Sequence, residues 1–304
     1  MRCLAFTACF FILLCKANAT EYAQNTIIEV SLNQLHPTQP AIGYDQVYYK
    51  LELFNINANT LLDEYCQSNG QGELLKAARG ANIHNSKSFT CSAAVGTYPE
   101  QMKTVVIGPQ QQFYLTDGHH TFSSLWEHSS AGPQLKMFVR VSDDFSDSVD
   151  LPSFWARMQD ANKVWLRSAQ DTPITPRQIP SSLGFKSLEN DPYRALVYFT
   201  RGAAYEKPHS GQTSTEYIEF YWGNWLRSQL DLNQYDLSNA STYRKAIEAA
   251  AELMVAAPEG TSLSHHGFTV RTLGGYGSID RKKLNKTIAK KLPLAIAYKR
   301  RATL

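Results

Sequence analysis

The stretch Tyr114-Leu115-Thr116-Asp117-Gly118-His119-His120-Thr121 decides the fold, because a β-rich run ends in it and a helical pattern begins in it. Residues 104–107 and 113–116 are rich in β-branched, aromatic and other apolar side chains, and the polar residues between the two runs predict a hairpin. Residues 121–128 follow with the spacing of a short helix. The sequence therefore predicts a hairpin, a tight turn and a helix.

The turn carries side chains that suit phosphate chemistry. A helix N-terminus presents unpaired N–H groups and a partial positive charge, which favour an anion, and Gly118 permits a close backbone approach or a positive φ. Asp117 can cap the helix, orient a histidine or bind a metal ion. His119 and His120 can act as acid, base, phosphate donor or metal ligand near neutral pH. An aspartate-capped helix with two surface histidines is the alternative without a function.

The segments on either side of the turn alternate between strands and short helices. Residues 27–32 alternate as a strand, residues 44–54 have helical spacing, and residues 136–141 are a further strand candidate. The polar, Gly-containing residues 55–97 are expected to be an insertion.

From residue 151 onward, apolar stripes that begin at Phe154, Ile218 and Tyr243 have helical spacing and are expected to form core. The sequence thus predicts an α+β fold, in which a small α/β domain over residues 20–150 precedes a mostly helical domain over residues 151–279. With 43% hydrophobic and 19% charged residues, the composition excludes disordered and fibrous proteins.

Residues 1–19 have the pattern of a secretory signal peptide. A basic residue precedes an apolar run at residues 4–14, and Ala17-Asn18-Ala19 supplies an A-x-A cleavage site. The run is shorter than the roughly 20 residues that a membrane span needs. We therefore expect a periplasmic or secreted protein with no transmembrane segment in the mature chain. An uncleaved anchor and a lipoprotein modified at Cys15 are the alternatives.

The cysteines predict one cross-link. Cleavage after residue 19 leaves Cys66 and Cys91, and neither belongs to a C-x-x-C pair of the kind used in metal or redox sites. Two cysteines in an exported protein favour a single disulfide between them.

Basic residues gather at the end of the chain. The full sequence has 30 Lys and Arg against 27 Asp and Glu, whereas residues 280–304 contain nine basic residues and one acidic residue. We expect this basic C-terminal tail to contact nucleic acid or anionic lipid. A solvated basic helix is the alternative.

Several stretches resemble the putative ParB-like nuclease family, a distant relative of the ParB N-terminal domain and of sulfiredoxin. In the first half they are Leu35-His36-Pro37-Thr38-Gln39-Pro40-Ala41-Ile42-Gly43 with Val47 and Lys50, Val105-Val106-Ile107-Gly108-Pro109, and the stretch around Asp117. Residues 191–196 (DPYRAL) and 219–227 (EFYWGNWLR) are similar to the helical half of that family. The D-G-H-H element also resembles that of archaeal free-serine kinases.

The resemblance implies a phosphate-binding turn that lies beside the Pro-Thr-Gln segment. Carried onto this sequence, it makes Asp117, His119 and His120 the catalytic residues. The residues that it implies for phosphate binding are Gly118, Thr121, Gln39 and Lys50. The chain lacks the G-E-R-R turn and helix-turn-helix of ParB and the cysteine turn of sulfiredoxin. CTP-dependent clamping, centromere binding and cysteine-sulfinate repair are therefore not expected.

The expected function is phosphodiester hydrolysis, as in a nuclease. One histidine acts as general acid or base, Asp117 orients it or binds a divalent metal ion, and Lys50 stabilises developing charge. One alternative is a phosphotransferase for a small hydroxylated substrate, although an exported protein meets little ATP. The other is a non-catalytic protein that binds nucleic acid or an anionic ligand. The identity of any cofactor stays open.

Other polar residues are weaker candidates. His209 and the pair His265-His266 are expected to be ordinary histidines, since adjacent histidines rarely bind one metal ion with good geometry. Arg194 and Arg227 are expected to form structural ion pairs with Glu216 or Glu219.

Overall fold

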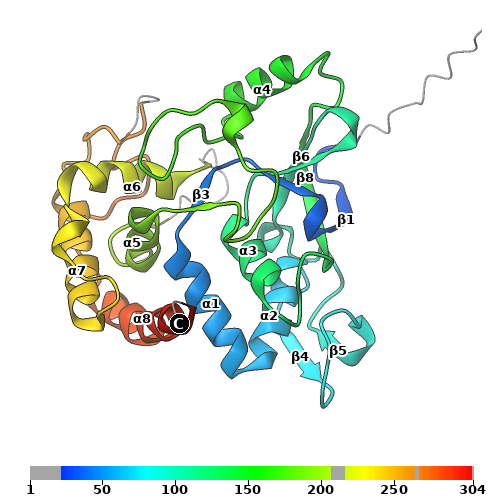
Figure 1. Ribbon diagram of the computed structural model, residues 1–304, viewed down its shortest axis with the longest axis horizontal. Helices are drawn as coiled ribbons and strands as arrows, with labels where there is room; N and C mark the ends of the chain where they lie inside the picture. Colours follow the sequence, from blue (N-terminus) through cyan, green and yellow to red (C-terminus); the bar gives the residue numbers. More distant parts are fainter. Residues whose placement is uncertain (1–21, 207–215, 264–266, 303–304) are drawn as a thin grey trace, which may run out of the picture.

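The computed structural model describes residues 22–206, 216–263 and 267–302 (Figure 1), so the predicted signal peptide at residues 1–19 lies outside the described residues. No helix in these ranges is long and apolar enough to cross a membrane. The strands are β1 (Ile27–Ser31), β2 (Leu35–Pro37), β3 (Ala41–Ile42), β4 (Leu74–Ala77), β5 (Phe89–Cys91), β6 (Thr104–Ile107), β7 (Phe113–Leu115), β8 (Lys136–Asp144) and β9 (Glu189–Asn190). The α-helices are α1 (Tyr44–Ile56), α2 (Ala58–Ser68), α3 (His119–Glu127), α4 (Leu151–Asp160), α5 (Pro192–Thr200), α6 (Ile218–Gln229), α7 (Ala240–Ala256) and α8 (Arg281–Ala302).

A mixed five-stranded sheet, in the order β1-β8-β6-β7-β2, forms the centre of the N-terminal part. β6 and β7 pair antiparallel, which confirms the predicted hairpin, and β7 is followed by α3 as expected. β2 joins the edge of the sheet parallel to β7, and β6 runs parallel to β8. The strand predicted at residues 27–32 and the helix predicted at residues 44–54 correspond to β1 and α1.

The sheet is covered on both faces, because successive side chains of a strand point to opposite sides. Val105 and Ile107 of β6 join the core formed with α1, α2 and α3. Val106, between them, packs with Phe154 and Met158 of α4. The apolar stripe that begins at Phe154 therefore covers the second face of the sheet.

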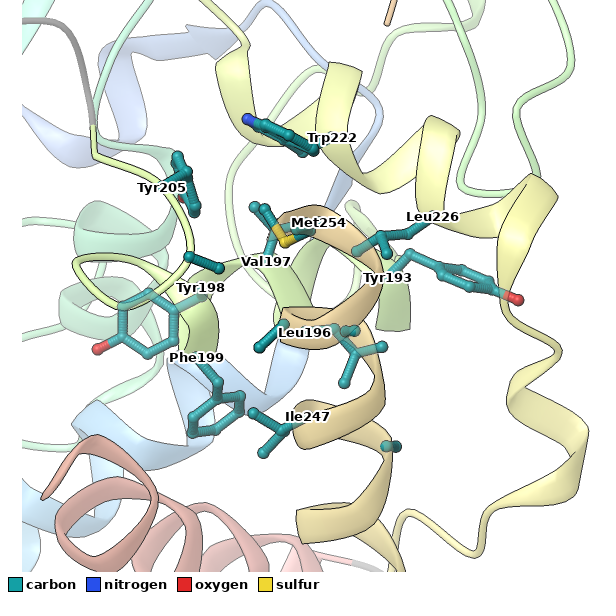
Figure 2. Close-up of a cluster of buried hydrophobic side chains, with 14 of the residues drawn as sticks. Tyr193, Leu196, Val197, Tyr198, Phe199, Tyr205, Trp222, Leu226, Ile247 and Met254 are labelled. Carbon is teal, nitrogen blue, oxygen red and sulfur yellow. The ribbon is translucent and has the colours of Figure 1, made fainter. Parts of the chain in front are cut away.

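The C-terminal part is mostly helical, and the predicted α+β fold is confirmed. Helices α5 to α8 gather on one side of the molecule and the sheet on the other, with α1 between them (Figure 1). Figure 2 shows the buried side chains of α5 packed between Trp222 and Leu226 of α6 and Ile247 and Met254 of α7. The domain boundaries at residues 150 and 279 stay predictions.

Residues 280–304, expected as a basic tail, contain the 22-residue helix α8. Its apolar side belongs to the helical core, and it packs along α1. Lys299 pairs with Asp45 of α1 at 3.2 Å, and Arg301 pairs with Glu52 of α1. Since both acids are almost completely buried, part of the basic charge of α8 serves to hold it on α1.

Cys66 of α2 and Cys91 of β5 form a disulfide with a Cα–Cα distance of 5.6 Å, as predicted. The bridge ties α2 to a small antiparallel sheet of β4 and β5, which is separate from the main sheet.

Breaking this bridge is expected to destabilise the protein. The disulfide spans a sequence separation of 25 residues, and for a loop of this length the chain-entropy model gives about 3 kcal/mol. Cys91→Ala is expected to lower the free energy of unfolding in urea by that amount. Reductant should lower the stability of the wild type and leave the variant unaffected. Equal stabilities of wild type and variant without reductant would contradict a formed bridge.

Candidate functional site

The turn between β7 and α3 (residues 116–118) is fixed by its backbone. Gly118 has φ +103° and ψ 8° and is the N-cap of α3, so it supplies no side-chain acceptor for the first N–H groups of the helix. A Cβ at this position would lie 2.6 Å from the side-chain carbons of Lys103. Thr116 is anchored to β6, because its backbone N–H donates to the carbonyl of Thr104 at 2.9 Å and the two hydroxyls lie 2.8 Å apart. The positive φ expected for Gly118 is present.

His119 and His120 are almost completely buried, with 3% and 7% of their surfaces exposed. The backbone N–H of Thr38 donates to Nε2 of His119 at 3.1 Å, and the N–H of Gly43 donates to Nε2 of His120 at 2.9 Å. The two imidazoles thus hold the 38–43 segment, which links β2 to α1, at both of its ends. The alternative of two surface histidines is wrong, since both side chains are structural ligands of this segment.

Burial keeps both imidazoles neutral at pH 7. It lowers the pKa of His119 to about 3, against the opposing effect of the Asp117 charge. The pKa of His120 is lowered well below its usual value by burial and then by the charge of Arg194. Because each Nε2 accepts a hydrogen bond, the single proton of each neutral ring lies on Nδ1. Each ring can therefore donate from Nδ1, while the electron pair on its Nε2 already accepts a backbone hydrogen bond.

Of the other predicted site residues, Gln39 and Thr121 line the same cavity as the turn, and Lys50 does not. Lys50 donates instead to Glu64 of α2 at 2.6 Å. Burial opposes the ionisation of Glu64, but the charge and the hydrogen bond of Lys50, with smaller effects of Lys103 and Thr121, lower the pKa of Glu64 overall. Lys50 therefore acts behind α3, where it compensates a carboxylate, and leaves the cavity to other cations.

A cavity of about 570 Å³ lies beside the β7–α3 turn. Besides Gly118, the two histidines, Gln39 and Thr121, it is lined by cationic and acidic side chains from both parts of the chain. Among the described residues the cations are Lys103, Arg140, Lys163, Arg194 and Arg201, and the acids are Glu100, Asp117, Asp143, Glu216 and Glu219. Lys163 pairs with Glu216 at 3.0 Å and with Asp143 at 3.7 Å, which neutralises one side of the lining.

Arg194 is the residue that sequence reasoning assigned only to structure. Its side chain is 7% exposed, and its Nη2 lies 3.3 Å from Oε2 of Glu219, as the predicted ion pair requires. Glu219 pairs at the same time with Arg201. The second predicted pair is wrong, because Arg227 pairs with Asp191 at 3.0 Å. Burial lowers the pKa of Arg194 to about 9, so its guanidinium stays charged at neutral pH.

The described residues include no group of three His, Cys, Asp or Glu side chains arranged to hold a metal ion. The weaker candidates His209, His265 and His266 lie outside the described residues.

The turn, the 38–43 segment, α5 and most of α6 fall within one matched region. The family model described as "Putative ParB-like nuclease" matches residues 28–228, which is more than half of the chain. The chain belongs to the putative ParB-like nuclease family. The matched region of the family includes Arg194 and Glu219 as well as the D-G-H-H turn, whereas α7 and α8 lie beyond it.

Two further comparisons describe how this family member relates to known proteins. Its structure is similar to that of protein Atu1540 from Agrobacterium tumefaciens, with a TM-score of 0.53 and 19% sequence identity over 84% of this chain and 100% of that chain. At this identity the likeness concerns the fold alone. No curated protein matches the sequence.

The buried histidines are expected to make the protein sensitive to acid. The unfolded imidazole of His119 takes up a proton near pH 6.5, whereas the folded one does so only near pH 3. Between these values the unfolded state binds more protons, so the free energy of unfolding falls as the pH falls. One such group contributes a slope of about 1.4 kcal/mol per pH unit.

His119→Gln removes this slope while a side-chain oxygen can still accept the Thr38 N–H. Chemical denaturation between pH 4 and 7 is expected to show a slope that is smaller by the contribution of one group. His84→Gln, at an exposed histidine, is the control and should follow the wild type. An unchanged slope in folded His119→Gln would mean that the imidazole is protonated in the native state.

Proposed function

We propose that this protein hydrolyses phosphate esters, with phosphodiesters of nucleic acid as the substrate class, in the cavity beside the β7–α3 turn. The observation that carries the proposal is the combination of a helix N-terminus without a capping side chain, the carboxylate of Asp117 and the buried Arg194 around one cavity. Backbone N–H groups and a guanidinium stabilise charge that develops on phosphate oxygens. Family membership supports the same substrate class.

The roles of the side chains in this proposal follow from their hydrogen bonds. Asp117 is the general base, because the Nε2 electron pairs of His119 and His120 are taken by backbone N–H groups. Asp117 removes a proton from a water molecule while the oxygen of that water molecule bonds to phosphorus. The ester P–O bond breaks, and the departing oxygen takes a proton from solvent. The imidazoles contribute Nδ1–H donors toward the phosphate oxygens.

The size of the cavity favours one nucleotide unit at a time. About 570 Å³ lies within the range of roughly 300–1,000 Å³ typical of small-molecule sites. A base-paired duplex does not enter such a space without strand separation, whereas a single strand presents its backbone and bases separately. We therefore propose single-stranded nucleic acid, or a duplex end that frays, as the preferred substrate.

The surface of α8 supports an encounter with nucleic acid. Lys282, Lys286 and Lys290 are exposed and follow one another at intervals of four residues, so they lie along one side of the helix. Cations in such a row attract a phosphate backbone and release its counterions. We propose that this row provides non-specific attraction; an anionic lipid surface would be attracted by the same charge.

The proposal includes a location outside the cytoplasm. The Cys66–Cys91 disulfide supports it, since such bonds persist in oxidising compartments, and the predicted signal peptide at residues 1–19 agrees with it. A periplasmic or secreted hydrolase needs only water as co-substrate. A phosphotransferase would need a nucleotide supply there and is the weaker alternative.

Asp117→Asn is expected to lower kcat about 10²- to 10⁴-fold, the range for loss of a general base. The assay compares hydrolysis of single- and double-stranded DNA and RNA by the purified protein, with added Mg²⁺, Mn²⁺ or Zn²⁺ and with EDTA. Asp143→Asn is the matched control, since Asp143 lines the same cavity but pairs with Lys163. It should keep most of the activity, and single strands should be cleaved faster than duplexes.

A non-catalytic binding protein is the second candidate function, and the engaged Nε2 atoms of both histidines favour it. Its expected outcome in the same assay differs from that of a hydrolase. The wild type would then bind an anionic ligand and cleave no substrate under any of the metal conditions. That result would replace the hydrolase proposal by the binding function.

A further inference from the structure

Arg194 is buried in an environment that does not match its full charge. It lies on α5 among apolar residues, and its own surface is only 6% exposed. Its carboxylate partner Glu219 also pairs with Arg201. A buried charge without a full partner is costly unless a further group compensates it. The charges of Asp191 and Asp117 also act on Arg194, so the feature of this arginine that calls for an explanation is its hydrogen bonding.

The guanidinium also has hydrogen-bonding capacity to spare. Nη2 lies 3.3 Å from a carboxylate oxygen of Glu219 in an ion pair, whereas Nε and Nη1 are buried and have no hydrogen-bond partner in the part of the chain that the structure describes. These two nitrogens carry three of the five N–H bonds of an arginine side chain. Unsatisfied buried donors are rare in folded proteins, and each one calls for a specific explanation.

Arg194 and the N-terminus of α3 border the same cavity. Arg194 lines the cavity together with Gly118, His119 and His120. Its charge contributes to lowering the pKa of both imidazoles, and the charge of Asp117 acts on Arg194 in return. Because these groups line one cavity of about 570 Å³, an anion bound in it can meet both the start of α3 and the guanidinium.

We infer that Arg194 binds the phosphate group of the substrate opposite the N-terminus of α3, and that Glu219 and Arg201 hold the guanidinium in position. This inference rests on the proposed function and names the residue that binds its substrate. Arg194 is then a binding residue that touches the phosphate, while Glu219 and Arg201 are positioning residues. Phe220, whose ring centre lies 5.6 Å from the guanidinium carbon, supports its orientation.

A purely structural ion pair explains less of the geometry. The neighbouring pair of Arg227 and Asp191 joins α5 to α6 by a 3.0 Å contact, and Asp191 also accepts from the N–H groups that begin α5. The two helices are therefore already tied together without Arg194. Arg227 does not line the cavity and its side chain is 22% exposed, so it is a control for the loss of an arginine ion pair between these two helices.

The test measures binding of inorganic phosphate and of a 5′-phosphorylated mononucleotide by calorimetry, with near-UV circular dichroism to verify folding. Arg194→Met should weaken the affinity about 10- to 100-fold, as loss of hydrogen bonds to a charged group predicts. The affinity of Arg194→Lys should lie between those of the wild type and Arg194→Met, and this variant provides the comparison if Arg194→Met does not fold. Arg227→Met should lower the melting temperature and keep the wild-type affinity.

Each outcome decides between the inference and the proposed function. Wild-type affinity in a folded Arg194→Met variant, or a wild type that binds neither probe, would overturn the inference. Asp117→Asn should still bind phosphate through Arg194 even though it no longer hydrolyses substrate. Binding that depends on Arg194 in a wild type without any hydrolysis supports the inference and overturns only the catalytic proposal.

Discussion

Two hydrogen bonds from backbone N–H groups to imidazole nitrogens determine how the parts of this protein meet. His119 and His120 follow one another in the first turn of α3, and their Nε2 atoms accept from Thr38 and Gly43, at the two ends of the 38–43 segment. A neutral ring is required for both bonds, because a protonated Nε2 cannot accept. Burial supplies this condition by lowering the pKa of each histidine.

The 38–43 segment also positions the helical part. β3, within the segment, pairs with β9, and the N–H of Asp191 donates to the carbonyl of Ile42 at 2.8 Å. Asp191 then caps α5, the helix that carries Arg194. At Gly43 a Cβ would lie 2.8 Å from the backbone nitrogen of Ala195, so only a glycine lets α5 approach this closely. The histidines and the arginine are thus set relative to each other by one short connection.

The sequence was sufficient for the local parts of this arrangement. Alternating and helical patterns around residue 117 predicted the hairpin, the turn and α3, because these elements are specified by neighbours in the chain. The Cys66–Cys91 bridge followed from the count of cysteines outside the predicted signal peptide. The family resemblance placed the turn beside the Pro-Thr-Gln segment, but local patterns gave no sign that His119 is buried there, since its partner Thr38 lies 81 residues away.

The role of Arg194 was hidden for a related reason. In the sequence it stands in an apolar helix beside acidic candidates, a pattern typical of a structural ion pair, and that pair with Glu219 does form. Only the folded chain shows that Arg201 shares the same carboxylate and that two nitrogens of Arg194 find no acceptor among the described residues. Lys50 is the opposite case: it matched the expected pattern for phosphate binding, but it compensates Glu64 behind the helix.

The distribution of charge explains why neutral histidines suit this site. The N-terminus of α3 already carries a partial positive charge, and Arg194 adds a full one at close range. Protonated imidazoles would add two more cations to this cavity. They would also release the 38–43 segment, which sets the position of Arg194 relative to α3. Keeping the rings neutral leaves the positive charge on the helix end and the guanidinium, where an anion can meet both. The same hydrogen bonds that organise the fold therefore preserve the electrostatic character of the cavity.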